Sequence, residues 1–147
     1  NTFMSPDHYR RYLKPFHQEC VALAHRHDVP IIKHSDGNFW KVIDDLLEIG
    51  FDGLHPIQPQ CMDIGAVKKY VAGRACLIGN IDCAQLLPFG TQAEVVAAVK
   101  DTIRTIAPGG GYILSSSNSI HPGCNPANVV AMFRTARQYG AYPIGVE

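Results

Sequence analysis

Polar side chains that can do acid–base or metal chemistry stand next to short apolar runs of the sequence. His34 and Asp36 follow the run at residues 29–32, and His55 lies within a second run at residues 53–57. Two imidazoles and a carboxylate can form a zinc site with an open coordination position. The same groups can instead form a hydrogen-bonded loop that begins the next helix, and both interpretations stay open.

Further polar residues follow these and the later apolar runs. Gln58, Asn80, Ser116 and Ser117 are candidate substrate-binding residues, because amides and hydroxyls both donate and accept hydrogen bonds. Asp82 is a candidate catalytic carboxylate. The alternative for Asp82 is a helix cap, and the alternative for the serines is a tight polar turn.

Four apolar runs alternate with amphipathic helical patterns. The runs at residues 29–32, 53–57, 75–78 and 112–114 have the length and branching of buried strands. The helices are predicted to begin at residues that can cap them, namely Ser5, Asn38, Asp63, Thr91 and Asn125. Strands that alternate with helices favour parallel pairing, so the predicted fold class is α/β.

The same periodicities predict which side chains are buried. The predicted strand core is Ile31, Ile32, Leu54, Leu77, Ile78, Ile113 and Leu114. The first helix is predicted to bury Tyr9, Tyr12, Leu13, Phe16, Cys20, Leu23 and Ala24. The last helix is predicted to bury Val129, Val130, Phe133 and Ala136.

Every candidate site residue lies at or just after the carboxyl end of a predicted strand. Parallel strands bring these ends to one edge, which is where (β/α)8 barrels and open α/β sheets place their sites. Eight strand–helix units usually take about 250 residues, whereas four units fill the 147 residues of this chain. We therefore predict a single domain, residues 1–147, that forms half of a (β/α)8 TIM-type barrel with four parallel strand–helix units.

Composition excludes several classes of partner and location. The 13 basic and 13 acidic residues cancel, which gives no electrostatic reason to expect nucleic acid or an anionic membrane as a partner. No apolar stretch is long enough to span a membrane, and residues 1–11 do not have the pattern of a secretory signal. The five cysteines are scattered without a Cys-x-x-Cys pair, so we expect a reducing, cytoplasmic setting.

Several segments resemble the carboxyl half of the uroporphyrinogen decarboxylase family. These are residues 34–38, 79–82, 90–91, 94–95, 108–114 and 125–128, in a consistent order along the chain. The resemblance implies a (β/α)8 barrel of which this chain supplies the last four strands. It also implies one of two chemistries: decarboxylation of porphyrinogen acetate groups without a cofactor, or zinc-assisted methyl transfer with corrinoid proteins or thiols.

The resemblance carries over to individual residues only in part. Decarboxylases of the family have a histidine shortly after the last strand, and the matching position here is Asn118. Their arginines and aspartate come from the amino-terminal half, which is absent. Methyltransferases have a His-x-Cys after the fifth strand, where this chain has His34-Ser35-Asp36, and a later cysteine, replaced here by Asn118 or Ser119. A zinc site in this chain would therefore use His34, Asp36 and His55, with no sulfur ligand.

These observations lead to one favoured function and two alternatives. We expect a fragment of a methyltransferase-type enzyme that moves a methyl group to or from a corrinoid or thiol, with catalytic roles for Asn118 and Asp82. The alternatives are a parent enzyme that decarboxylates a tetrapyrrole, a lyase reaction of porphyrin biosynthesis, and a non-catalytic half-barrel. The absence of an initiator methionine favours truncation. The expected partners are a small-molecule substrate, a corrinoid protein, and a second copy bound through the exposed barrel edges.

Overall fold

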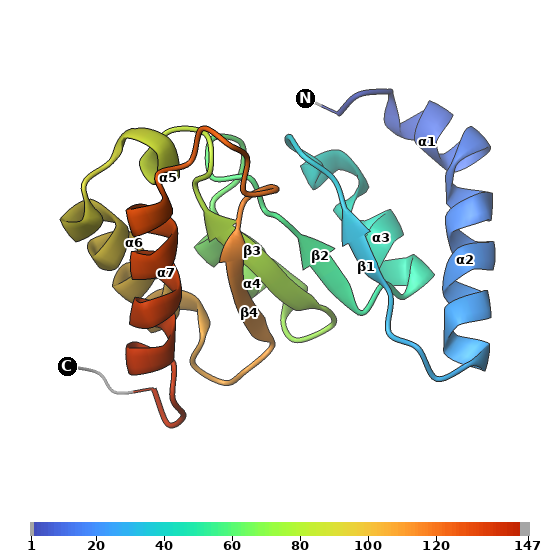
Figure 1. The fold of residues 1–147 in the computed structure, drawn as a ribbon. Coiled ribbons are helices and arrows are strands. Elements are labelled where there is room, and N and C mark those ends of the chain that lie inside the picture. Colours follow the sequence, from blue (N-terminus) through green and yellow to red (C-terminus); the bar gives the residue numbers. More distant parts are fainter. Residues whose placement is uncertain (1, 145–147) are drawn as a thin grey trace.

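A four-stranded parallel sheet forms the centre of the protein, and the computed structural model describes residues 2–144 (Figure 1). The strands pair in sequence order and are β1 (Ile32–His34), β2 (Gly53–His55), β3 (Cys76–Ile81) and β4 (Tyr112–Ser116). This arrangement confirms the predicted α/β class. β1 begins at the end of its predicted run, because Pro30 has no N–H and the Ile31 N–H donates to the Asp52 carboxylate at 2.7 Å.

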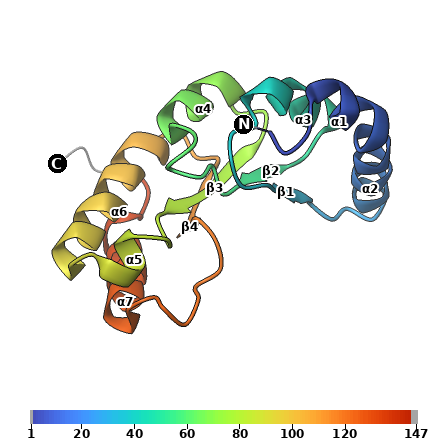
Figure 2. The same cartoon turned by 90° about the horizontal axis from the view of Figure 1, so that it is seen from above.

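Helices connect the strands and lie on the outer side of the curved sheet (Figure 2). They are α1 (Pro6–Tyr12), α2 (Lys14–Arg26), η1 (Trp40–Val42), α3 (Ile43–Ile49), α4 (Ile64–Val71), α5 (Leu86–Phe89), α6 (Gln92–Ile106) and α7 (Pro126–Tyr139). Leu54 and Leu77, at the same register level of β2 and β3, are fully buried. None of the described helices is long and apolar enough to cross a membrane.

Capping residues mark most of the predicted helix starts. Ser5, Asp63 and Asn125 each accept a backbone N–H of the first turn, and Thr91 forms a capping box with Glu94. Asn38 is different, because its side chain accepts the Trp40 N–H at the start of η1, one turn before α3.

The prediction of one long first helix is wrong. Pro15 would clash with the carbonyl of the preceding turn, so the chain breaks at Leu13 into α1 and α2. Of the predicted face only Tyr9 is buried, whereas Tyr12, Phe16 and Leu23 are more than half exposed.

The predicted strand core is correct for the central strands and wrong for the edges. Leu54, Leu77 and Ile78 are buried, whereas Ile31 and Leu114 are only partly buried. Ile32 and Ile113 are 52% and 54% exposed. They lie on the edge strands β1 and β4 and alternate away from the helices, so no described element covers them.

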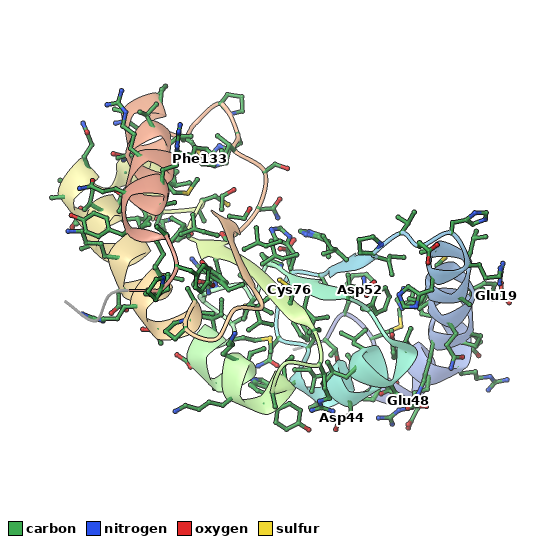
Figure 3. All side chains as sticks on the ribbon, turned by 90° about the horizontal axis from the view of Figure 1, so that it is seen from below. Glu19, Asp44, Glu48, Asp52, Cys76 and Phe133 are labelled. Carbon is green, nitrogen blue, oxygen red and sulfur yellow. The ribbon has the colours of Figure 1, made fainter. Side chains whose placement is uncertain are left out.

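The predicted buried face of α7 is correct only in part. Val129 and Ala136 are partly buried against the core, whereas Val130 and Phe133 are about half exposed (Figure 3). The buried residues of this helix are Asn128, Ala131, Met132 and Thr135. The Asn128 amide donates to the carbonyls of Leu87 at 3.1 Å and Gly90 at 2.7 Å. These two hydrogen bonds fix the rotation of α7 about its axis. The spacing of apolar residues in the sequence does not show this constraint.

Candidate functional site

His34 and His55 lie side by side at the carboxyl ends of β1 and β2. The strand register pairs them directly, and their Nδ1 atoms are 2.7 Å apart. The ring centroids are 4.9 Å apart and the ring planes are inclined by 32°. The sequence predicted that these residues would share one edge of the sheet, and the structure brings the two rings into direct contact.

The hydrogen bonds of His55 determine where the protons of this pair sit. Its Nε2 lies 3.3 Å from the Ser116 carbonyl oxygen, which can only accept, so Nε2 carries the hydrogen. The Nδ1 of neutral His55 is then an acceptor, and His34 Nδ1–H donates to it. His34 Nε2 is consequently the atom of the pair at which a proton can be gained.

Asp36 extends this network to the loop after β4. Its carboxylate accepts from the Asn118 amide at 3.1 and 3.3 Å and lies 3.6 Å from His34 Nε2. The Ser116 hydroxyl donates to the Asn118 backbone carbonyl at 2.7 Å. We call these five residues (Asn118, Asp36, His34, His55 and Ser116) the strand-end cluster.

The strand-end cluster exists because the sheet curves. β1 and β4 are the two edge strands, yet Asn118 reaches Asp36, and Ser116 reaches His55 past the intervening β3. Figure 2 shows the strands inside an arc of helices. This curvature is that of part of a barrel, and it converts three strand ends into one site.

Burial sets the protonation of His55. Desolvation lowers the pKa of His55 below its usual 6.5, and the nearby His34 lowers it further. The hydrogen bond to Ser116 and the Asp36 charge act in the opposite direction without reversing the shift. His55 is therefore neutral at pH 7 and can accept the His34 proton.

The predicted zinc ligands do not fit a three-ligand site in this arrangement. The Nδ1 atoms of His34 and His55 face each other at hydrogen-bond distance, so both cannot bind one ion at the same time. Among residues 2–144 no group of three or more His, Cys, Asp or Glu side chains is arranged to hold a metal ion. The zinc site stays a prediction that would require the two rings to separate.

Two predicted substrate-binding residues hold the loops around the cluster. The Gln58 side chain accepts the Gly37 N–H at 2.7 Å, which joins the loop after β2 to the loop after β1. The buried Asn80 amide donates to the Ile57 carbonyl at 2.8 Å. Asn80 follows Gly79, where a side chain would meet the Pro56 carbonyl oxygen at 2.1 Å, so only glycine allows this approach.

The other predicted residues divide between the cluster and the protein interior. Ser116 belongs to the cluster, mainly through its backbone carbonyl, which the sequence could not indicate. The Ser117 hydroxyl is buried and donates to the Cys83 sulfur at 3.3 Å. Asp82 accepts the Ala84 N–H at 2.7 Å within the turn before α5 and does not cap that helix, whose N-cap residue is Gln85. A catalytic role for Asp82 stays a prediction.

Sequence reasoning did not single out Lys33, which lies between Ile32 and His34 in β1. Its side chain is half buried, and Nζ donates to the His34 carbonyl at 2.8 Å. A lysine within a three-residue strand is the signal that could have drawn attention to it, because solvated lysines are depleted in strands.

Comparison of the sequence with protein families gives one family over nearly the whole chain. Residues 1–139 match the family described as uroporphyrinogen decarboxylase (URO-D). The chain is 29% identical to the uroporphyrinogen decarboxylase of Schizosaccharomyces pombe, over 94% of this chain and 40% of that protein. It is 28% identical to the uroporphyrinogen decarboxylase of Legionella pneumophila (strain Lens), over 92% of this chain and 38% of that protein.

Comparison with solved structures gives a protein with a different activity. A methyltransferase from Methanosarcina mazei superposes with a TM-score of 0.80 at 25% identity, over 94% of this chain and 39% of that structure. Four parallel strands matched to this part of a larger chain confirm a partial TIM-type barrel. The chain spans about 40% of the length of the curated relatives that it matches.

Proposed function

The chain belongs to the uroporphyrinogen decarboxylase (URO-D) family, and from this membership we propose that its strand-end cluster is the proton-donating part of a barrel enzyme that removes a group from a small molecule. The observation that carries the proposal is the 2.7 Å contact between His34 and His55. It leaves His34 Nε2 as the atom that takes up and releases a proton, 3.6 Å from the Asp36 carboxylate.

Both reactions in this part of the family can use such a donor. In methyl transfer from an oxygen, nitrogen or sulfur carrier, the bond from the methyl carbon to the carrier atom breaks, the methyl group bonds to an acceptor, and the carrier atom keeps the electron pair. In decarboxylation a carbon–carbon bond breaks, carbon dioxide leaves, and the remaining carbon keeps the pair. In these cases a proton must reach the atom that holds the pair, and protonated His34 supplies it.

The other members of the cluster hold the His34 ring in position. A proton on His34 Nε2 lies on the side of the Asp36 carboxylate, which is 3.6 Å away. His55 accepts from Nδ1 and so holds the ring in one orientation, while Asn118 holds Asp36. These roles use the side chains alone, and the donor atoms of His34 and His55 do not fit a three-ligand metal site in this arrangement.

We place methyl transfer first among the reactions. It is supported by the superposition on the Methanosarcina mazei methyltransferase and by the His34-x-Asp36 spacing after β1. A small-molecule substrate and a corrinoid or thiol acceptor belong to this proposal.

Tetrapyrrole decarboxylation is the second reaction, and the curated relatives support it equally well. In this reading the carboxylate-binding groups come from the remainder of the barrel. Lyase activity in porphyrin biosynthesis belongs to this second proposal.

The test is an assay of the complete gene product for both reactions, with methylated donors plus a corrinoid or thiol acceptor, and with porphyrinogens. We expect His34→Gln to lower turnover about 100-fold or more in whichever reaction occurs, as is usual for loss of a general acid. Gln18→Ala, on the exposed side of α2, is the matched control and should keep full turnover. Full turnover of His34→Gln would reject the proposed role, and a complete protein inactive in both assays would reject both reactions.

A further inference from the structure

A cavity of about 190 Å³ lies beside β1, between α1, α2 and α3. Figure 2 shows the segment that leads into α1 running past the end of β1 and beside α3. The apolar part of the cavity wall includes Phe39, Val42 and Leu46, all buried. An apolar cavity of about 150 Å³ accommodates a benzene ring, so this one has room for a single ring with a small substituent.

Lys33 contributes the positive charge of this cavity. It alternates with His34 along β1, so the two side chains leave opposite faces of the strand. Its Nζ has one hydrogen bond, to the His34 carbonyl, and it takes part in none of the ion pairs between described residues. Burial lowers the pKa of Lys33 below its usual 10.5, because the ammonium group has lost part of its hydration.

Tyr9 and His17 provide the other polar part of the wall near Lys33. The Tyr9 hydroxyl lies 2.9 Å from His17 Nδ1. Burial raises the pKa of Tyr9 to about 12, so the phenol keeps its proton and donates it to Nδ1. His17, whose pKa is lowered by burial and by Lys33, is then neutral with its hydrogen on Nε2.

Asp36 is the one carboxylate among residues 2–144 that lines the cavity. Its oxygens are engaged elsewhere, because they accept from Asn118 and lie 3.6 Å from His34 Nε2. The Lys33 ammonium group therefore faces an apolar wall and the Tyr9–His17 pair, and it forms no ion pair with a carboxylate of the described residues. A desolvated cation in this position favours an anionic ligand.

We propose that this cavity binds a small carboxylate with an apolar body of about one ring, its carboxylate paired with Lys33 and its body packed on Phe39, Val42 and Leu46. The ion pair would restore the electrostatic stabilisation that Lys33 has lost by burial. The apolar body would fill the space between β1 and the helices. The ligand would pair with Lys33 on the face of β1 opposite to His34, and Asp36 is the residue that this cavity shares with the strand-end cluster.

The proposal is tested by titrating the ¹⁵N-labelled chain with benzoate and, separately, with neutral benzamide of nearly the same shape. We expect benzoate to shift the Lys33 and Phe39 amide signals saturably, with a dissociation constant at least tenfold lower than that of benzamide. Lys33→Met should bind both compounds equally weakly. Lys69→Met, which removes an exposed charge on α4, should keep the preference.

A second variant covers the case in which Lys33→Met fails to fold. Val42→Phe fills the cavity while keeping every charge, and we expect it to weaken benzoate at least tenfold. The proposal is overturned if benzoate causes no saturable shift, if benzamide binds as tightly as benzoate to the unchanged chain, or if folded Lys33→Met keeps the preference.

Discussion

His34 and His55 share one hydrogen bond between their Nδ1 atoms, 2.7 Å long, across two neighbouring parallel strands. Two neutral imidazoles can form such a bond only if one ring donates and the other accepts. The Ser116 carbonyl determines the direction, because it requires a hydrogen on His55 Nε2. The tautomer of one ring therefore determines the tautomer of the other.

The direction of the hydrogen bond from His34 Nδ1 to His55 Nδ1 predicts the tautomers of both rings above pH 7. His34 should carry its hydrogen on Nδ1 and His55 on Nε2, which long-range ¹H–¹⁵N correlation spectra distinguish. In His55→Ala the acceptor is lost, and we expect His34 to show a mixture of tautomers. Observation of the Nε2–H tautomer of His34 in the unchanged chain would contradict the assigned hydrogen bond.

Two partly buried histidines, His17 and His55, lead to a prediction of how stability depends on pH. Burial lowers the pKa values of His55 and His17 below 6.5 in the folded chain. Below pH 6.5 the unfolded chain then binds more protons than the folded chain, so the free energy of unfolding falls as the pH falls through this range. The slope from each histidine is at most about 1.4 kcal/mol per pH unit.

Urea unfolding at pH 7.5, 6.5 and 5.5 measures this dependence. His55→Asn should reduce the slope, whereas Gln18→Ala, which changes no titratable group, should keep it. A free energy of unfolding that is constant or rises as the pH falls from 6.5 to 5.5 would show that burial of the two histidines does not govern stability in this range.

The strand order and most helix starts could be predicted because they depend on local patterns. Branched apolar runs and capping residues such as Thr91 act within a few residues of sequence. The exposed sides of Phe16 and Phe133 could not be predicted, because periodicity shows that a face is apolar and does not show what covers it. For α7 the deciding contact is Asn128 with Leu87, 41 residues apart.

The sequence could predict which strand ends form the site, but it could predict the contacts between their side chains only in part. Parallel pairing is enough to place His34 and His55 at one edge. Their direct contact depends on the register that opposes them, and the Asp36–Asn118 bond depends on the curvature of the whole sheet. Neither the register nor the curvature can be read from the spacing of these residues.

We expect loss of the Asp45 carboxylate to destabilise the fold more than loss of the Glu48 carboxylate, although both residues lie on α3. Its buried carboxylate accepts from Arg10 at 3.0 Å and from Lys14 at 2.9 Å. Asp45→Ala should lower the free energy of unfolding by about 3 kcal/mol, because it removes the buried partner of two cations. Glu48, which also pairs with Lys14 but is largely exposed (Figure 3), is the control.

Glu48→Ala should cost less than about 1 kcal/mol, as expected for an exposed ion pair. Thermal or urea unfolding of both variants measures the two costs. Equal costs would mean that burial of Asp45 adds nothing to its ion pairs.

The exposed edge residues Ile32 and Ile113 predict self-association of this chain. Both are more than half exposed and lie on edge strands that pair with a neighbour on one side only. Uncovered apolar strand edges favour pairing between copies. We expect sedimentation to show a dimer at micromolar concentration, which would bury about 1,600 Å² in a specific interface. Ile32→Glu combined with Ile113→Glu should give a monomer. Phe133→Glu, at an exposed position of α7, should keep the dimer. A monomeric unchanged chain would rule out this association.

The Asp36–Asn118 bond predicts a rescue by exchange of the two residues. Asn118→Asp replaces the amide donor by a second carboxylate and should lower the free energy of unfolding by about 1 kcal/mol, because both side chains are half exposed. It keeps an oxygen that can accept the Ser119 N–H, so the loss reports on Asp36 alone. Adding Asp36→Asn restores one donor and one acceptor and should recover the stability. In the complete enzyme the exchanged pair should nevertheless stay impaired, because no carboxylate then stands at position 36 beside His34 Nε2. Recovery of activity together with stability would show that Asp36 only links the two loops and that its carboxylate is not needed beside His34.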